Sequence, residues 1–273
     1  MRITFKKMNG LGNDFMVVEW FHDPVPPGAD VVRRWADRRR GVGFDQLALL
    51  TAVDADRAEA RYRIFNADGG EAEQSGNGVR CLARYLAPFL GEELTLIGPT
   101  RAVAARVLSG DRVSVDLGTP DFRPQALPFT AARQQERYRL EVANDAVELG
   151  AVSMGNPHVV IPVDSVDAAP VGILGPALER HASFPKGVNV GFLQREDSKR
   201  VRLRVFERGA GETLACGTGA AAAVAVGRLW GELDADVTVS LPGGELEVSW
   251  PGPGHSLWQT GPTTAVYEGR IEL

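Results

Sequence analysis

The sequence contains few cysteines and histidines and no long apolar run. Its 273 residues include two cysteines and four histidines, and their spacing fits neither a zinc site nor a disulfide framework. The most apolar stretch, residues 220–226, is far shorter than the roughly 20 residues that span a bilayer. The first residues do not resemble a signal peptide, because Lys6, Lys7 and Asn9 interrupt their apolar character. We therefore expect a cytoplasmic enzyme or binding protein without a metal.

Excess positive charge is also lacking. Thirty Lys and Arg residues face 35 Asp and Glu residues, which gives a net charge of −5. This balance argues against nucleic acid or an anionic membrane as a partner. A run of three arginines at residues 38–40 is more typical of a solvated helix end than of a phosphate site. With 44% hydrophobic and 24% charged residues, the chain has the composition of an ordinary globular protein with substantial cores.

Alternating apolar and polar residues dominate the chain, whereas helical patterns are few. Helices are expected at residues 29–41, with Asp30 as N-cap and Gly41 as the stop, at residues 77–88, ending at Pro88, and at residues 217–231. Period-2 segments predict strands at residues 3–8, 14–20, 46–53, 60–65, 94–97, 103–108, 112–117, 138–142, 147–154, 158–163, 188–193, 200–207, 236–241, 245–250 and 264–271. The pattern predicts an α+β protein built mainly from sheets.

The two halves of the chain resemble each other. When "FNADGGEAEQSGNG" is shifted by 141 residues onto "FERGAGETLACGTG", the phenylalanine, the glutamate and three of the glycines coincide, and Ser75 falls on Cys216. A shift of 143 residues superimposes the Gly-Asn pair of "GLGNDF" on that of "MGNPHV", and Gln46 on Asn189. Self-similarity of this length indicates two copies of one domain rather than a short-period solenoid.

We therefore expect two related domains, each a strongly bent, mostly antiparallel sheet around one main helix. The first would comprise residues 1–118 and 262–273, and the second residues 119–261. The repeat would place the two glycine-rich turns face to face, with the active site in the cleft between the domains.

Each glycine-rich turn leads from a strand into a helix. The first N–H groups of a helix lack intrahelical partners, and the helix dipole adds positive potential there, so the turn suits a carboxylate. A thiol at this place is expected to have a lowered pKa, which would let Cys216 act as a base or nucleophile. The alternative is a buried, inert cysteine. Cys81, more than one helical turn beyond Ser75, is expected only to pack.

Seven motifs carry a resemblance to a known family. "GLGNDF", "GFDQ", "FNADG", "GNGVRC", "MGNPH", "GVNV" and "ERGAGETLACGTGA" resemble the diaminopimelate epimerases in order and spacing across essentially the whole chain. The resemblance implies two pseudo-symmetric domains, no cofactor and commonly a homodimer, with the C-terminal strand returning to the first domain. It also implies that one cysteine removes the α-hydrogen of diaminopimelate as a thiolate, while a second delivers a proton from the opposite face. This reaction interconverts the L,L and meso forms for lysine and peptidoglycan synthesis.

The resemblance also implies a set of substrate-binding residues. Arg208 suits a carboxylate and Glu207 an ammonium group, while the asparagines offer both donors and acceptors. His158 is a candidate for lining the site or, equally, a histidine at a strand end. The implied positions are Asn13, Gln46, Asn66, Gly76, Asn77, Asn156, Asn189, Glu207, Arg208, Gly217 and Thr218.

One position departs from the family pattern. Ser75 stands where the first catalytic cysteine belongs, and a serine is far less acidic and needs a neighbouring base. The leading hypothesis is an epimerase of low activity in which Ser75 and Cys216 occupy the two acid/base positions. Two alternatives stay open: a one-base lyase or dehydratase of a hydroxylated amino acid, and a non-catalytic amino-acid-binding protein.

Overall fold

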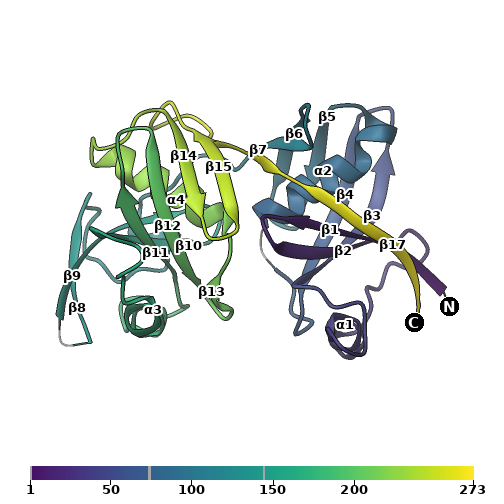
Figure 1. The fold of residues 1–273 in the computed structure, drawn as a ribbon, viewed down its shortest axis with the longest axis horizontal. Coiled ribbons are helices and arrows are strands. Elements are labelled where there is room, and N and C mark those ends of the chain that lie inside the picture. Colours follow the sequence, from purple (N-terminus) through teal and green to yellow (C-terminus); the bar gives the residue numbers. More distant parts are fainter. Residues whose placement is uncertain (1, 73–74, 144) are drawn as a thin grey trace. The chain divides into compact units, whose positions relative to one another are not determined.

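The chain divides into two compact units in the computed structural model, which describes residues 2–72, 75–143 and 145–273. Unit 1 comprises Met1–Asp116 and Thr260–Leu273, and unit 2 comprises Leu117–Gln259. Strands greatly outnumber helices in both units (Figure 1), which confirms the predicted α+β class.

The described residues of unit 1 (2–72, 75–116 and 260–273) form one mixed sheet and two helices. The strands pair in the spatial order β17, β1, β2, β3, β4, β5, β6, β7, and only the β2–β3 and β4–β5 pairs are parallel. The helices are α1 (Ala29–Ala36) and α2 (Gly76–Leu90). The strands are β1 (Arg2–Gly10), β2 (Asn13–Glu19), β3 (Gln46–Asp54), β4 (Glu59–Asn66), β5 (Glu93–Ile97), β6 (Ala102–Val107), β7 (Arg112–Asp116) and β17 (Thr264–Glu272).

Unit 2 repeats this architecture. Its strands pair in the order β8, β9, β10, β11, β12, β14, β15, with β13 added to the end of β12. The helices are α3 (Val171–Glu179), α4 (Gly217–Leu229) and the 3₁₀ turn η1 (Pro124–Ala126). The strands are β8 (Tyr138–Val142), β9 (Asp145–Ser153), β10 (Pro157–Pro162), β11 (Asn189–Arg195), β12 (Arg200–Glu207), β13 (Gly211–Thr213), β14 (Asp236–Leu241) and β15 (Gly244–Ser249); β16 (Trp258–Pro262) spans the unit boundary.

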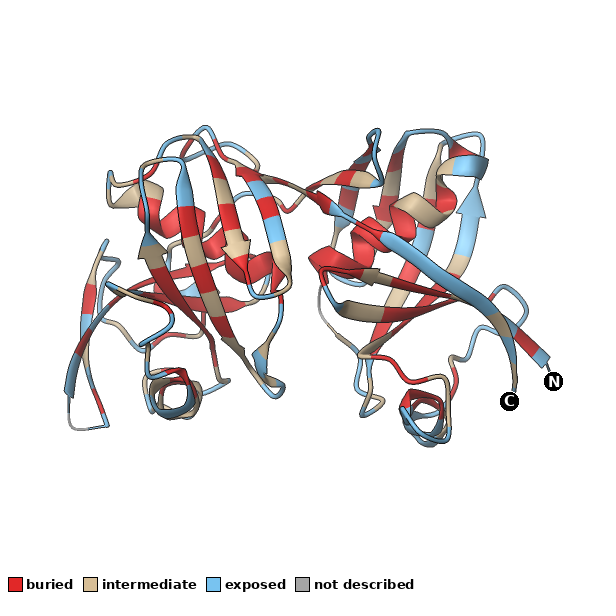
Figure 2. Ribbon diagram, viewed as in Figure 1, coloured by how far each residue is buried: buried red, intermediate tan, exposed pale blue. Residues whose placement is uncertain are grey.

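In each unit the sheet curves around one central helix. Helix α2 contacts β1, β2, β3, β5, β6 and β7, and helix α4 contacts β9, β10, β11, β12 and β15. Residues 76–83 of α2 and residues 217–227 of α4 are all buried, as the red segments of both helices show (Figure 2). Glycine and alanine predominate in residues 217–227, where small side chains let the backbone lie close to the surrounding strands.

The repeat deduced from the sequence is also present in the strand register. The parallel pair β2–β3 places Phe15 opposite Gln46, and the parallel pair β10–β11 places His158 opposite Asn189, at the same offset of 143 residues. Helices α2 and α4 begin 141 residues apart, at Gly76 and Gly217. The two units therefore share one topology down to the pairing of equivalent residues.

Several element boundaries differ from the sequence-based expectation. Helix α1 starts after Gly28, so Asp30 lies inside its first turn, and it ends at Ala36 because the Asp37 carboxylate accepts the N–H groups of Arg39 and Arg40. Helix α2 continues past Pro88 to Leu90, because a proline in the last turn removes only one backbone hydrogen bond.

Four elements were not expected from the sequence: helix α3, the short 3₁₀ turn η1, and strands β13 and β16. Helix α3 contains Gly172, Gly175 and Pro176, which argue against a helix, but packing against β11 and β12 holds it in place. Strand β13, with three residues, and strand β16, with five, are too short for a clear alternating pattern.

The tight contact between β9 and α4 leads to a stability prediction. A Cβ atom on Gly150 would collide with a Val226 methyl group and lie 2.9 Å from the Trp230 ring, whereas one on Gly172 in α3 would meet nothing within 4 Å. Gly150→Ala is expected to lower the free energy of unfolding by about 1–3 kcal/mol through overpacking. The matched control Gly172→Ala should leave it unchanged or raise it by up to about 1 kcal/mol. Urea denaturation of both variants measures this, and equal midpoints would refute the packing argument.

Candidate functional site

Helices α2 and α4 are capped by the two residues at which the acid/base groups are expected. Ser75 and Cys216 are the N-cap residues, both with extended backbone conformation. The Gly78 N–H donates to Ser75 Oγ over 3.2 Å, and the Gly219 N–H donates to Cys216 Sγ over 3.4 Å. Each side chain thus satisfies one of the donors left open at a helix start. The equivalence of Ser75 and Cys216 is therefore geometric as well as sequential.

Ser75 and two predicted substrate residues, Gln46 and Asn66, form a hydrogen-bonded row. The Ser75 hydroxyl donates to Gln46 Oε1 over 2.8 Å, and Gln46 Nε2 donates to Asn66 Oδ1 over 2.8 Å. Ser75 is buried, with 9% of its surface exposed. Because the acceptor of its proton is a neutral amide oxygen, this contact does not turn the hydroxyl into a nucleophile or a base. We call Asn13, Gln46, Asn66, Ser75 and Asn77 the Ser75 site.

Around Cys216, the main partner is a carboxylate. Cys216 Sγ donates to Glu207 Oε2 over 3.0 Å, and the Thr213 hydroxyl donates to Glu207 Oε1 over 2.6 Å. Burial and the negative charge of Glu207 raise the pKa of the Cys216 thiol well above its ordinary value. The expectation of a lowered pKa was wrong, because the hydrogen bonds from Gly219 and Thr218 are outweighed by burial and by Glu207.

A hydrogen-bonded chain approaches Cys216 from the other side. His158 Nε2 lies 2.9 Å from Asn156 Oδ1, Asn156 Nδ2 donates to Thr218 Oγ1 over 3.3 Å, and Thr218 Oγ1 lies 3.7 Å from Cys216 Sγ. Burial and the positive charge of Arg208 lower the pKa of His158 to about 3, so its ring is neutral near pH 7. A neutral ring with its proton on Nε2 fits the Asn156 contact.

Two further predicted residues support the turn that carries Glu207. Asn189 Oδ1 accepts the Arg208 N–H over 2.9 Å, and Asn189 Nδ2 donates to the Pro157 carbonyl over 2.9 Å. The Arg208 guanidinium donates to the Lys186 carbonyl over 3.2 Å. We call Asn156, His158, Asn189, Glu207, Arg208, Cys216 and Thr218 the Cys216 site. Gly76 and Gly217 lie at the first positions of α2 and α4.

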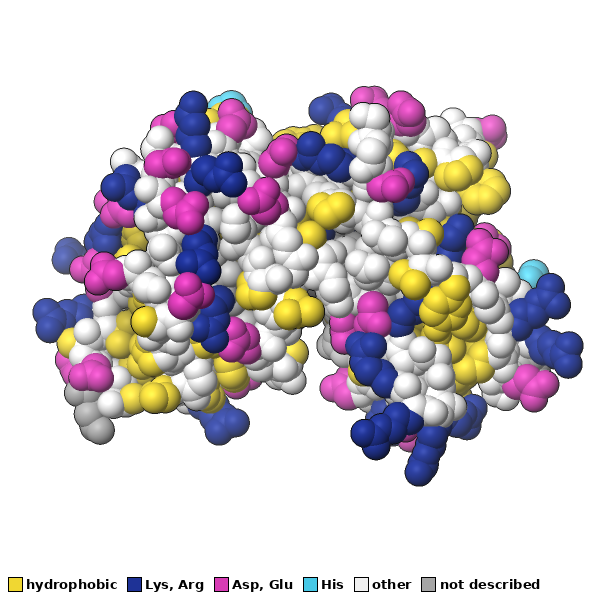
Figure 3. All heavy atoms as spheres, viewed as in Figure 1, with side chains coloured by type: hydrophobic (Ala, Val, Ile, Leu, Met, Phe, Trp, Pro, Cys, Tyr) yellow, Lys and Arg dark blue, Asp and Glu magenta, His cyan; other side chains and the backbone are white. Residues whose placement is uncertain are grey.

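Other residues expected from the sequence have structural roles. Cys81 is fully buried, and burial raises the pKa of its thiol to about 12, as expected for a packing residue. Arg38 lies just past the end of α1 and is exposed, as expected for a helix-end residue, and its guanidinium also pairs with Asp14 and Asp45. On the face shown in Figure 3, Lys and Arg side chains alternate with Asp and Glu.

Sequence reasoning missed four residues beside the predicted ones: Asp14, Asp45, Arg80 and Thr213. They contact Asn13, Asn77 and Glu207 directly or through one another. Asp45 and Arg80 lie within the motifs "GFDQ" and "GNGVRC". The sequence signal that could have found them is this proximity: Asp45 directly precedes Gln46, and Arg80 follows Asn77 by three residues.

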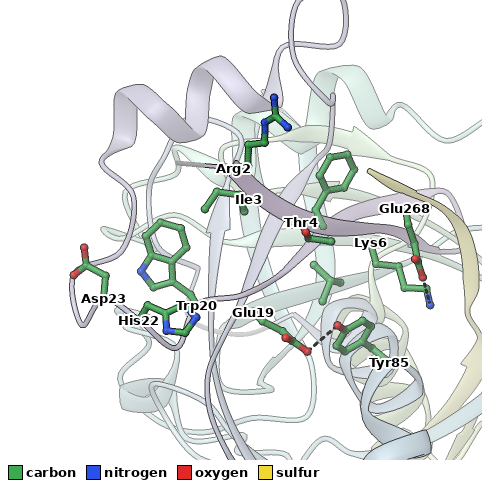
Figure 4. A pocket seen from close by; sticks show the side chains of 12 residues that line it. Arg2, Ile3, Thr4, Lys6, Glu19, Trp20, His22, Asp23, Tyr85 and Glu268 are labelled. Carbon is green, nitrogen blue, oxygen red and sulfur yellow. Dashed lines mark hydrogen bonds and ion pairs between the residues drawn. The ribbon is translucent and has the colours of Figure 1, made fainter. Parts of the chain in front are cut away.

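A surface pocket of about 290 Å³ lies on unit 1, where Phe5, Trp20 and Tyr85 provide aromatic walls (Figure 4). Two pairs of its polar groups interact, Tyr85 with Glu19 over 2.9 Å and Lys6 with Glu268 over 3.0 Å. None of the Ser75 site residues lines it. Within residues 2–72, 75–143 and 145–273 there is no cluster of three or more His, Cys, Asp or Glu side chains suited to a metal, and no helix long and apolar enough to cross a membrane.

The contact between Cys216 and Glu207 leads to a prediction about the thiol. Glu207→Gln removes the negative charge that opposes the thiolate, so the pKa of Cys216 is expected to fall. The thiolate absorbance in the ultraviolet, followed against pH with Cys216→Ala as the blank, measures this shift. Glu212→Gln is the matched control, because Glu212 pairs with Arg204. The same midpoint in Glu207→Gln and Glu212→Gln would contradict the assignment.

Comparison with known proteins shows the family of the chain. The family model described as diaminopimelate epimerase matches residues 5–117 and 150–266. Proteins named diaminopimelate epimerase from Alkalilimnicola ehrlichii and Pseudomonas savastanoi pv. phaseolicola are 50% and 47% identical over the full length of both chains. A solved probable proline racemase from Agrobacterium radiobacter K84 has the same fold, with a TM-score of 0.73 at 18% identity, over 99% of this chain and 93% of that one. The chain belongs to the diaminopimelate epimerase family.

Proposed function

We propose that the protein interconverts L,L- and meso-2,6-diaminopimelate by proton transfer at the α-carbon, without a cofactor and at a low rate. The main support for this proposal is that the two central helices begin in the same way. The Ser75 side chain accepts the Gly78 N–H, and the Cys216 side chain accepts the Gly219 N–H. Each start supplies backbone donors of the kind that bind the α-carboxylate of an amino acid. An acid/base group would then stand on each face of the α-carbon.

At the Cys216 site the chain has the groups for removing a proton. Transfer of the thiol proton to Glu207, 3.0 Å away, leaves a thiolate and a neutral carboxylic acid. The thiolate takes the α-hydrogen, and the electrons of the C–H bond remain on the α-carbon, stabilised by the bound carboxylate. Because the pKa of the Cys216 thiol is raised, the re-formed thiol holds its proton firmly, so deprotonation is the demanding step on this face.

At the Ser75 site the return of a proton is disfavoured. Epimerisation requires Ser75 to give its proton to the carbanion and to become an alkoxide, and the neighbouring Gln46 amide cannot offset that charge as a base would. The carbanion therefore mostly recovers a proton from the Cys216 face and keeps its configuration. We infer that the α-hydrogen exchanges with solvent faster than the stereocentre inverts.

Recognition of the distal end of the substrate is assigned to the polar residues of both sites. Arg208 provides a planar cation suited to bidentate binding of a carboxylate. Asn66, with an exposed side chain, and the partly buried Asn156 provide amide groups for the ammonium and carboxylate of a second amino-acid end. A small amino acid would leave these groups unused, which favours a diamino diacid.

The serine leads to a prediction about rate. Ser75→Cys is expected to raise the rate of epimerisation of L,L-diaminopimelate by about a hundredfold or more, because a thiol is the more effective acid/base group. Ser75→Ala is the matched control that removes the hydroxyl and adds no acid. Polarimetry or chiral chromatography measures inversion, and mass spectrometry in heavy water measures exchange. Equal rates in Ser75→Cys and the parent chain would refute the proposal.

The same assays separate the alternatives. Release of a keto acid from 3-hydroxylated amino acids, without inversion of diaminopimelate by Ser75→Cys, would favour a one-base lyase or dehydratase. Tight binding of diaminopimelate with no exchange in either form would favour a non-catalytic binding protein. The neutral amide beside Ser75 is compatible with one-base chemistry, and only the products distinguish the two enzymes.

We further propose a cytoplasmic homodimer. Val266 and Tyr267 on β17 expose 54% and 46% of their surfaces, and large exposed apolar side chains that adjoin one another are typical of contact surfaces. Light scattering tests the oligomeric state.

A further inference from the structure

A buried arginine lies one turn inside the helix that Ser75 caps. Arg80 has no exposed surface, and its Nη2 donates to Asn77 Oδ1 over 2.6 Å. Burial lowers the pKa of Arg80 only to about 10, so the guanidinium is charged at neutral pH. A guanidinium has donors and no acceptor, so it can face only the oxygen of the Asn77 amide. The contact therefore fixes which way this amide points.

The orientation of Asn77 is passed on to Asn13. Asn77 Nδ2 donates to Asn13 Oδ1 over 3.2 Å, and Asn13 Nδ2 donates to Asp45 Oδ2 over 3.2 Å. The hydrogen bonds thus run in one direction, from Arg80 through Asn77 and Asn13 to Asp45. A cation stands at the donor end and a carboxylate at the acceptor end. We call these four residues the oriented chain.

The acceptor end is itself firmly held. Arg38 Nη2 donates to Asp45 Oδ1 over 2.7 Å and also pairs with Asp14, whose other cationic partner is Lys7 at 2.6 Å. Burial alone would raise the pKa of Asp14, but the hydrogen bonds from Arg38 and Lys7 hold it well below its usual range. The Asp14 N–H also donates to Asp45 Oδ2 over 3.0 Å. These contacts keep the Asp45 carboxyl group in place as an acceptor for Asn13.

Exchanging the oxygen and the NH₂ group of either amide is unfavourable, because Arg80 fixes the chain at one end and Asp45 fixes it at the other. A flipped Asn77 would turn its NH₂ group toward the Arg80 donors, and a flipped Asn13 would turn its oxygen toward the Asp45 carboxylate. In the observed orientation the oxygen of each amide accepts a hydrogen bond within the oriented chain, and its NH₂ group donates one. Because both amide oxygens are engaged within the oriented chain, Asn13 and Asn77 are oriented to offer N–H groups, and not oxygens, to a ligand.

We propose that Arg80 and Asp45 are positioning residues, which hold Asn77 and Asn13 with N–H groups directed to the substrate carboxylate at the Ser75 site. This inference rests on the proposed function, since the carboxylate belongs to the amino-acid substrate. Neither residue touches the substrate; each acts through the amide beside it. The device distinguishes a carboxylate from an ammonium group at this site.

The other unit has no such device. The repeat offsets place Ala221 and Val188 at the positions of Arg80 and Asp45, and both are fully buried apolar residues. Thr218 stands at the position of Asn77, and a hydroxyl can rotate to suit its partners. The charged ends of the oriented chain are therefore a property of the Ser75 site and not of the shared fold.

The test is the binding of diaminopimelate, measured by titration calorimetry on the full-length protein. Arg80→Met keeps the length of the side chain and removes its donors, and it is expected to weaken binding about tenfold, or about 1.4 kcal/mol. Arg80→Lys, which retains a donor, should recover part of the loss. Arg84→Met is the matched control, because Arg84 lies one turn further along α2 and pairs with Asp111 outside the oriented chain.

A double-mutant cycle separates positioning from general stability. If Arg80 acts through Asn77, Arg80→Met should change the affinity little once Asn77→Ala is present. Should Arg80→Met fail to fold, Asp45→Asn tests the opposite end of the oriented chain, with an expected loss of about threefold to tenfold. Affinities equal to that of Arg84→Met, or an undiminished Arg80 effect in the Asn77→Ala background, would overturn the inference. Absence of diaminopimelate binding by the parent chain would instead overturn the proposed function, and this inference with it.

Discussion

The unsatisfied N–H groups at the start of a buried helix are the constraint on which both sites depend. Helices α2 and α4 lie inside curved sheets, so their first residues have no bulk water to satisfy them. A side chain at the N-cap must accept one N–H, and Ser75 and Cys216 both do so. A group that can accept a hydrogen bond there is also placed to exchange a proton with a ligand at the helix end.

The residues beside the two N-cap side chains differ between the units. Beside Cys216 stands Glu207, a carboxylate that can accept the thiol proton; beside Ser75 stands Gln46, an amide that can only hold the hydroxyl in one orientation. Near the Ser75 site, the charged groups of the oriented chain stand at its two ends, Arg80 at one and Asp45 at the other. One site therefore has the means to move a proton, and the other has the means to orient a ligand.

Much of the fold was predictable because its signals are local or repeated. Alternating apolar residues located most strands, and the offsets of 141 and 143 residues reappear in the helix starts and the parallel strand pairs. Helix α3 was not predictable, since its glycines and proline are tolerated only through packing on β11 and β12. The sequence was sufficient to propose the residues of both sites, but not the direction in which the pKa of Cys216 is shifted. The direction of the Cys216 pKa shift depends on burial and on Glu207, and both arise only when β12 and α4 come together.

In the proposed reaction, the raised pKa of Cys216 explains why a serine at position 75 is expected to slow inversion. A thiol with a raised pKa is seldom ionised, but its thiolate is a strong base, so in the proposed reaction the Cys216 face removes the α-hydrogen and the re-formed thiol is the proton donor nearest the carbanion. Inversion needs a competitor on the other face that gives up its proton at a comparable rate. A hydroxyl bonded to an amide and to a backbone N–H, as Ser75 is, has no group to accept the charge that such a transfer leaves behind. The two faces of the proposed reaction therefore differ in their proton donors, Cys216 and Ser75. The orientation of the Asn13 and Asn77 amides does not depend on this difference.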